Sequence, residues 1–179
     1  KMMGPIILED MSLQQAVMKH MNQNAPLYFG LVLQIPKEDG LAHAAESAED
    51  FFKVGSVARV IQVSPFKPGE PLQILVQALE RFDILALKPK DSLFVAEVRY
   101  RYGPIQENTD ELKAYSVAII DCIKDLVNMN PLFKEGLSLL IERINLSDPG
   151  SLADFAAAMT TSSGKEIQKI LETSDIRQR

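Results

Sequence analysis

The residue types that most often carry chemistry are few in this chain and lie far apart. His20 and His43 have no cysteine, histidine or carboxylate at the short spacings that metal sites use. The single cysteine, Cys122, lies in an apolar helical pattern without a nearby base, so we expect a small buried residue and not a nucleophile. The G-x-S-x-G, H-E-x-x-H and G-x-G-x-x-G signatures are absent. We therefore predict no catalytic residue, no metal site and no cofactor in this chain.

One dipeptide, Gly164-Lys165, imitates the end of a phosphate-binding loop. Residue 159 is Met where that loop needs glycine, Glu166 stands where it needs serine or threonine, and no predicted strand precedes it. Ser163 with Glu166 three residues later has the spacing of a capping box. We interpret the dipeptide as the start of a helix.

Large apolar side chains occur where burial is not obviously needed, and they are the better candidates for function. Phe66 lies inside a loop-like segment, residues 64–71, which contains three prolines and a glycine. Five methionines crowd the first 21 residues. Methionine is flexible and polarizable, and Met-rich surfaces bind varied peptides. The alternative is that most of these methionines fill gaps in a core.

The bulk properties are those of a soluble globular protein. The chain has 179 residues, 46% of them hydrophobic and 24% charged, and its net charge is −5. An acidic chain repels a phosphate backbone, which argues against a nucleic-acid partner. No apolar run approaches the ~18 residues of a membrane span, so we predict no membrane partner. One cysteine cannot form an internal disulfide, and we expect a reducing, cytoplasmic location.

The candidate residues are carried by two segments that differ in secondary structure, the first rich in β-strands and the second helical. The predicted fold class is therefore α+β. Residues 1–105 are β-rich, with a helix after Ser12 and a short turn around residues 47–52. Residues 106–179 show helical periodicity and read as a bundle of about four helices. The predicted strands are Leu27–Ile35, Val54–Val63, Leu72–Leu87 and Leu93–Tyr102.

Start signals mark the helices of the second part. Asn108 or Thr109 is placed to cap the first of them. Asn130-Pro131 and Asp148-Pro149 each combine a capping side chain with a proline at the first helical position. The first helix carries an apolar stripe that we expect to face the core, formed by Leu112, Tyr115, Ile119, Ile123 and Leu126.

The strand VGSVARVIQV, residues 54–63, contains one charge and one glycine within an apolar run. We expect Arg59 at the rim of the sheet, with its aliphatic stem on apolar surface and its guanidinium in water. Gly55 predicts a bulge or a tight bend and not a ligand contact.

Two blocks of sequence carry a resemblance to a known family. EDFFKVGSVARVIQV, followed by LQILVQALERFDIL, resembles the N-terminal domain of Lon, the ATP-dependent protease. INLSDPGSLADFAAAM and EIQKILETSDIRQR resemble that family's later helices, in the same order. The resemblance spans nearly the whole chain. The chain departs from the family in two respects. The short first strand that the family usually has ahead of the segment matched by residues 2–8 is missing, and Ala78 stands where many members have glycine.

The resemblance implies a PUA-like β pseudo-barrel over residues 1–105, packed on the helical bundle of residues 106–179. It also implies that the chain is a fragment of an ATP-dependent serine endopeptidase. The ATPase module, with its ATP and magnesium, and the Ser–Lys peptidase module would lie downstream. The family works as a hexamer, so a homo-oligomer is implied for the full-length protein.

The function that this resemblance implies is non-catalytic recognition of unfolded or damaged polypeptides in protein quality control, together with support of hexamer assembly. Two alternatives stay open: a purely structural, oligomerisation domain, and a PUA-like RNA-binding module, which the acidic charge disfavours. The residues predicted to contact substrate are Met2, Met3, Phe66, Met129 and Phe133.

Overall fold

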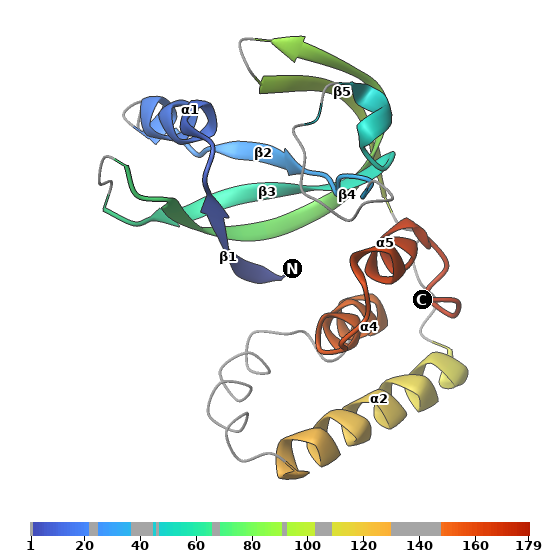
Figure 1. Cartoon of the computed structure of the whole chain (residues 1–179). Coiled ribbons are helices and arrows are strands. Elements are labelled where there is room, and N and C mark those ends of the chain that lie inside the picture. Colours follow the sequence, from blue (N-terminus) through green and yellow to red (C-terminus); the bar gives the residue numbers. More distant parts are fainter. Residues whose placement is uncertain are drawn as a thin grey trace. The chain divides into compact units, whose positions relative to one another are not determined.

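The computed structural model describes residues 2–21, 25–36, 45, 47–65, 69–90, 93–102, 109–129 and 148–179. It divides into two compact units, Met3–Tyr102 and Gly103–Arg179. The first unit is mainly β and the second is helical (Figure 1). Phe66 and Phe133, two of the predicted contact residues, and the helix start at Asn130 lie outside the described residues.

The first unit contains one antiparallel sheet. Its elements in chain order are β1 (Met3–Leu8), α1 (Met11–Met21), β2 (Tyr28–Leu31), the 3₁₀ turn η1 (Ala48–Asp50), β3 (Val54–Val63), β4 (Leu72–Lys90) and β5 (Leu93–Arg101). The strand order is β1-β4-β3-β2, with β5 also paired to β4. Within the described residues, no strand pairing joins the two ends of this sheet.

Strand β4 organises the sheet because it is long enough to serve three partners. Residues 74–77 pair with both β1 and β3, and residues 81–83 pair with both β3 and β5. A strand has only two edges, so β1 and β5 must follow one another along the edge of β4 opposite β3. Beyond Asp83, β5 is the one described strand that accompanies β4, and the two strands form the curved hairpin at the upper right of Figure 1.

Helix α1 covers one face of the sheet (Figure 1). Its Val17 packs in a buried cluster with Ala58, Leu72, Ile74 and Val76. Alternate residues of a strand point to the same face, which is why three of these come from positions 72, 74 and 76 of β4. This cluster is the core of the first unit.

The start of α1 differs from the prediction. The backbone N–H of Leu13 donates to the Asp10 carboxylate at 2.9 Å, so Asp10 caps the helix in place of Ser12. Gln14, which is buried in the first turn of α1, donates from Nε2 to the carbonyl oxygen of Leu8 at 2.8 Å. This hydrogen bond connects α1 to the end of β1. Strand β1 itself has no counterpart among the strands that the residue pattern predicted.

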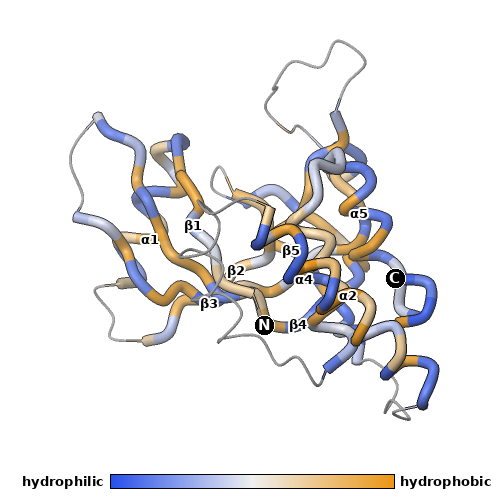
Figure 2. Tube along the Cα trace, turned by 90° about the horizontal axis from the view of Figure 1, so that it is seen from below, coloured by the Kyte–Doolittle hydropathy of each residue, from blue (hydrophilic) through white to orange (hydrophobic). Residues whose placement is uncertain are grey.

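The second unit contains α2 (Asp110–Met129), α4 (Pro149–Ala158) and α5 (Gly164–Glu172). Ile123 of α2 packs with Leu152 and Phe155 of α4 in the core of this unit. Hydrophobic and hydrophilic positions alternate along α2 in Figure 2, as expected for a helix with one packed side. Among the described helices, none is long and apolar enough to cross a membrane.

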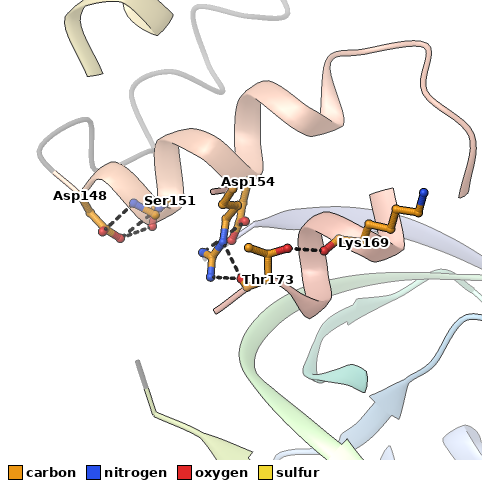
Figure 3. Close-up of polar contacts among 7 residues, drawn as sticks. Asp148, Ser151, Asp154, Lys169 and Thr173 are labelled. Carbon is orange, nitrogen blue, oxygen red and sulfur yellow. Dashed lines mark hydrogen bonds and ion pairs between the residues drawn. The ribbon is translucent and has the colours of Figure 1, made fainter. Parts of the chain in front are cut away.

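Local capping explains where these helices begin. The Asp148 carboxylate accepts hydrogen bonds from the N–H groups of Gly150 and Ser151, ahead of Pro149 at the first helical position (Figure 3). Ser163 and Glu166 form the predicted capping box of α5, so the Gly164-Lys165 dipeptide is a helix start. The Asp148-Pro149 and Ser163 predictions are confirmed.

Candidate functional site

Potential catalytic groups are not brought together in the described part of the chain. It contains no group of three or more His, Cys, Asp or Glu residues that could hold a metal ion. Nδ1 of His20 lies 3.2 Å from the carbonyl oxygen of Ala16 on its own helix. The prediction that Cys122 is buried is wrong, because its side chain is exposed on α2. Its position falls outside the side of α2 that packs on α4.

Arg59 lies within the sheet and is bound more closely than predicted. Its Nη2 donates to Oε1 of Gln77, directly opposite on β4, at 3.2 Å. Its Nε is buried and has no hydrogen-bond partner in the described structure. The guanidinium is therefore partly removed from water and is hydrogen-bonded to a neighbouring side-chain amide. This environment is that of a structural residue packed in the sheet and not that of a binding site.

Gly55 lies beside a β-bulge, and its close packing gives a further reason for glycine. The register of β3 and β4 shifts between Ser56 and Ala58. A Cβ atom on Gly55 would lie 2.6 Å from the carbonyl oxygen of Leu31 and 2.7 Å from Cζ of Phe82. Only a residue without a side chain leaves room for that ring.

The charged cluster of the sheet joins β4 to β5. Arg101 donates to Oδ1 of Asp83 from Nε at 2.9 Å and from Nη2 at 2.6 Å, and Arg99 donates to Oδ2 at 3.5 Å. The hydrogen bonds from Arg101 lower the pKa of Asp83, with a smaller contribution from Arg99, while burial opposes the shift. A carboxylate held by two arginines is a poor proton donor or acceptor near neutral pH, so this cluster is a clamp between strands.

The described members of the predicted contact set lie on different elements. Met2 precedes β1 and is 38% exposed, whereas Met3 is half-buried in β1 opposite Gln77. Met129 ends α2 and is 81% exposed. Met3 and Met129 belong to different units.

The structure adds exposed aromatic side chains at the end of β5 that the sequence prediction missed. Tyr100 and Tyr102 are 43% and 79% exposed, and their ring centroids lie 6.1 Å apart. Tyr100 lies opposite Phe82, which is only 2% exposed. Residues paired across neighbouring strands share a face, so the exposed Tyr100 lies on the same face of the sheet as the buried Phe82. The alternation Arg-Tyr-Arg-Tyr at residues 99–102 was the available signal, because alternate residues of a strand share a face.

Helix α2 presents a second exposed apolar set, formed by Tyr115, Val117, Leu126 and Met129. Tyr115 and Leu126 were predicted to face the core together with Ile123, and that prediction is wrong. Ile123 packs against α4, while Tyr115 and Leu126 lie beside the packed side and remain exposed. Both units therefore offer large apolar side chains on regular secondary structure.

Comparison with known proteins links this arrangement to one family. The profile of the ATP-dependent protease La (LON) substrate-binding domain matches residues 1–179. The Lon protease of Chlamydia pneumoniae is 36% identical over an alignment of 179 positions, which covers 99% of this chain and 21% of that protein. Lon protease 1 of Syntrophotalea carbinolica is 40% identical over 134 residues, or 75% of this chain and 16% of that protein. The chain spans about a fifth of the length of these relatives.

Two solved structures have a similar fold. One is the N-terminal domain of a Mycobacterium avium complex Lon protease, with a TM-score of 0.64 and 22% identity, covering 99% of this chain and 84% of that one. The other is a Lon N-terminal domain protein from Xanthomonas campestris, with a TM-score of 0.64 and 12% identity, covering 98% and 83%. At these identities the likeness shows the fold alone, and the predicted α+β class is confirmed.

Proposed function

Because the chain belongs to the family of LON substrate-binding domains, we propose that it captures unfolded or damaged polypeptides and passes them to downstream modules of an ATP-dependent protease. Those modules would be an ATPase, which uses ATP and magnesium, and a serine peptidase. The protein would work as a homo-oligomer in the cytoplasm, a compartment that suits its single unpaired cysteine.

The observation that supports this proposal is the exposure of large apolar side chains on strands and helices. Unfolded chains differ from folded ones chiefly by exposing apolar side chains and unpaired backbone. Tyr102 and Met129, which are 79% and 81% exposed, can bury such side chains on contact. Methionine and tyrosine adapt to partners of varied shape, which suits a surface that must accept many sequences.

Weak individual contacts are an advantage for such a domain. A substrate that is pulled onward by a motor must leave each contact easily. Several copies of the domain around one assembly raise the effective concentration of binding sites, and overall retention becomes strong without any tight single site. Apolar contacts that do not depend on exact geometry meet both needs.

The proposal is tested by substitution in each unit. The probe is a fluorescein-labelled protein that has been reduced and carboxymethylated so that it cannot refold. We expect Tyr102→Ser and Met129→Ser each to weaken its binding about three- to tenfold, since each removes roughly 1 kcal/mol of apolar contact. Phe66→Ser and Phe133→Ser stay predictions from the sequence, with the same expected direction.

Matched variants separate apolar contact from general damage to the fold. Tyr102→Phe keeps the ring, and Asn128→Ser changes an exposed polar neighbour of Met129. Both should bind as the unsubstituted chain does. If the serine variants of Tyr102, Met129, Phe66 and Phe133 all bind with unchanged affinity, capture by exposed apolar side chains is wrong for this chain.

A further inference from the structure

Three strands of the sheet each have only one strand partner among the described residues. Strand β2 pairs with β3, whereas β1 and β5 each pair with β4. The free edge of such a strand carries N–H and C=O groups that can pair with another extended chain. The free edges of β1, β2 and β5 differ in how well they are protected against pairing with another strand.

Two of these edges carry features that limit strand addition. Strand β1 includes Gly4 and Pro5 within its six residues, and proline has no N–H to donate. Strand β2 has four residues and is therefore too short to hold much of a partner strand.

Strand β5 lacks both kinds of protection. It has nine residues and contains neither proline nor glycine. The side chains of Val95, Ala96, Glu97, Arg99 and Tyr100 are all exposed, so both faces of the strand are open to water along this stretch. Among the three strands with one described partner, β5 is thus the longest and the one that lacks these protective features.

Pairing of β5 with a second copy of itself is disfavoured by its charges. A two-fold symmetric, fully overlapped antiparallel pair of residues 93–101 has Glu97 at its centre. The two Glu97 carboxylates would then lie directly opposite one another, and like charges at such positions are destabilising. A different chain has no such conflict.

We propose that β5 is a docking edge at which an extended segment of an unfolded polypeptide adds as a further antiparallel or parallel strand. This inference rests on the proposed function and names where, and in what conformation, the substrate is held. Main-chain hydrogen bonds recognise any sequence, which suits substrates that share only the lack of a fold. Tyr100 and Tyr102, on the face that continues from Phe82, add apolar contact to alternate side chains of the bound segment.

Proline substitutions on β5 test the proposal. Neighbouring residues of an antiparallel strand direct their N–H groups to opposite edges. Of Ala96→Pro and Glu97→Pro, one therefore removes an N–H from the pairing with β4 and lowers the melting temperature. The other removes an N–H from the free edge and leaves the melting temperature close to that of the unsubstituted chain. We expect this second variant to bind the carboxymethylated probe about tenfold more weakly, because one main-chain hydrogen bond is lost and the proline ring stands in the way of the added strand. Glu97→Gln controls for the charge.

A peptide probe tests the same point without changing the protein. It has the length of β5, is rich in Val, Thr and Lys, and is made with and without N-methylation of its two neighbouring central residues. N-methylation leaves the side chains in place and blocks the centre of both edges, because neighbouring residues direct their N–H groups to opposite edges. We expect the methylated peptide to bind at least about tenfold more weakly than the unmethylated one.

The outcomes separate this inference from the proposed function. If the unsubstituted chain does not bind the carboxymethylated probe, the proposed function fails. If it binds the probe while the stable proline variant or the methylated peptide binds equally well, capture occurs elsewhere and the β5 inference is wrong. If sedimentation shows a dimer that the stable proline variant abolishes, the edge holds a second copy and not a substrate.

Discussion

The phenyl ring of Phe82 lies so close to the backbone of Gly55 that a Cβ atom on Gly55 would be 2.7 Å from Cζ of the ring. A Cβ atom on Gly30 would lie 3.0 Å from the same Cζ atom. Phe82 is buried, and its neighbour across the strands is Tyr100. The glycines of β2 and β3 thus make room for a buried ring whose cross-strand neighbour on β5 is the exposed Tyr100.

Substitution of Gly55 by alanine should destabilise the first unit. The new methyl group must displace Phe82 and the Leu31 carbonyl oxygen, and such overpacking costs about 1–3 kcal/mol. Chemical denaturation measures the change. Gly4→Ala is the matched control, because a Cβ there meets nothing within 4 Å. Equal stability of the two variants would show that the ring does not occupy this space.

The ion pairs of Asp83 predict a dependence of stability on pH. Its pKa is lowered in the folded state, chiefly by the hydrogen bonds from Arg101, so its contribution is present above the unfolded pKa. That contribution is lost as the pH falls through the folded pKa, in the region below about pH 4. Asp83→Asn should lower the melting temperature at neutral pH and flatten its fall in acid. Asp110→Asn, at an almost fully exposed carboxylate, should do neither.

Arg59 should tolerate an apolar replacement. Its Nε is buried without a partner in the described structure, so Arg59→Met removes an unsatisfied donor while it keeps most of the stem. We expect the free energy of unfolding to stay within about 0.5 kcal/mol of the original value or to rise. Binding of the carboxymethylated probe should be unchanged. A loss of binding with intact stability would make Arg59 part of the site.

The cap of α4 gives a prediction for the second unit. Asp148→Ala leaves the N–H groups of Gly150 and Ser151 without their side-chain acceptor and should lower stability by about 1 kcal/mol. Asp148→Asn retains an acceptor oxygen and should recover most of the loss. Thermal unfolding followed by circular dichroism measures both variants. Failure of asparagine to recover stability would mean that the charge, and not the cap, is what matters.

The features of the fold that could be predicted are those set by neighbouring residues. The starts of α4 and α5 depend on a side chain and a backbone N–H two or three residues away, so the sequence displays them directly. Strand β1 could not be predicted this way, because Gly4 and Pro5 interrupt its pattern and its existence depends on β4. Strand β4 runs on to Lys90, past Leu87, where the prediction ended it. Pro89 is tolerated there because β3 no longer accompanies β4 and the proline lies in a two-stranded hairpin.

The sequence could not predict which apolar side chains of the candidate site are exposed and which are buried. Tyr115 and Ile123 fall on the same predicted stripe of α2, yet only Ile123 packs against α4. Helical spacing gives the direction of a side chain to within about a quarter turn, and that is too coarse to separate the centre of a packed side from its border. The alternation that pairs Tyr100 with Tyr102 is visible in the sequence, but the position of Tyr100 opposite the buried Phe82 depends on the register between β4 and β5, which is a long-range property.

The central claim is that this chain recognises the unfolded state of its partners. Its most direct test is fluorescence anisotropy of one labelled protein, presented either folded or reduced and carboxymethylated, titrated with the chain. Preferential binding of the unfolded form, weakened by Tyr102→Ser and Met129→Ser, is the predicted result. Equal binding of the two forms, or no binding of either, would contradict the account.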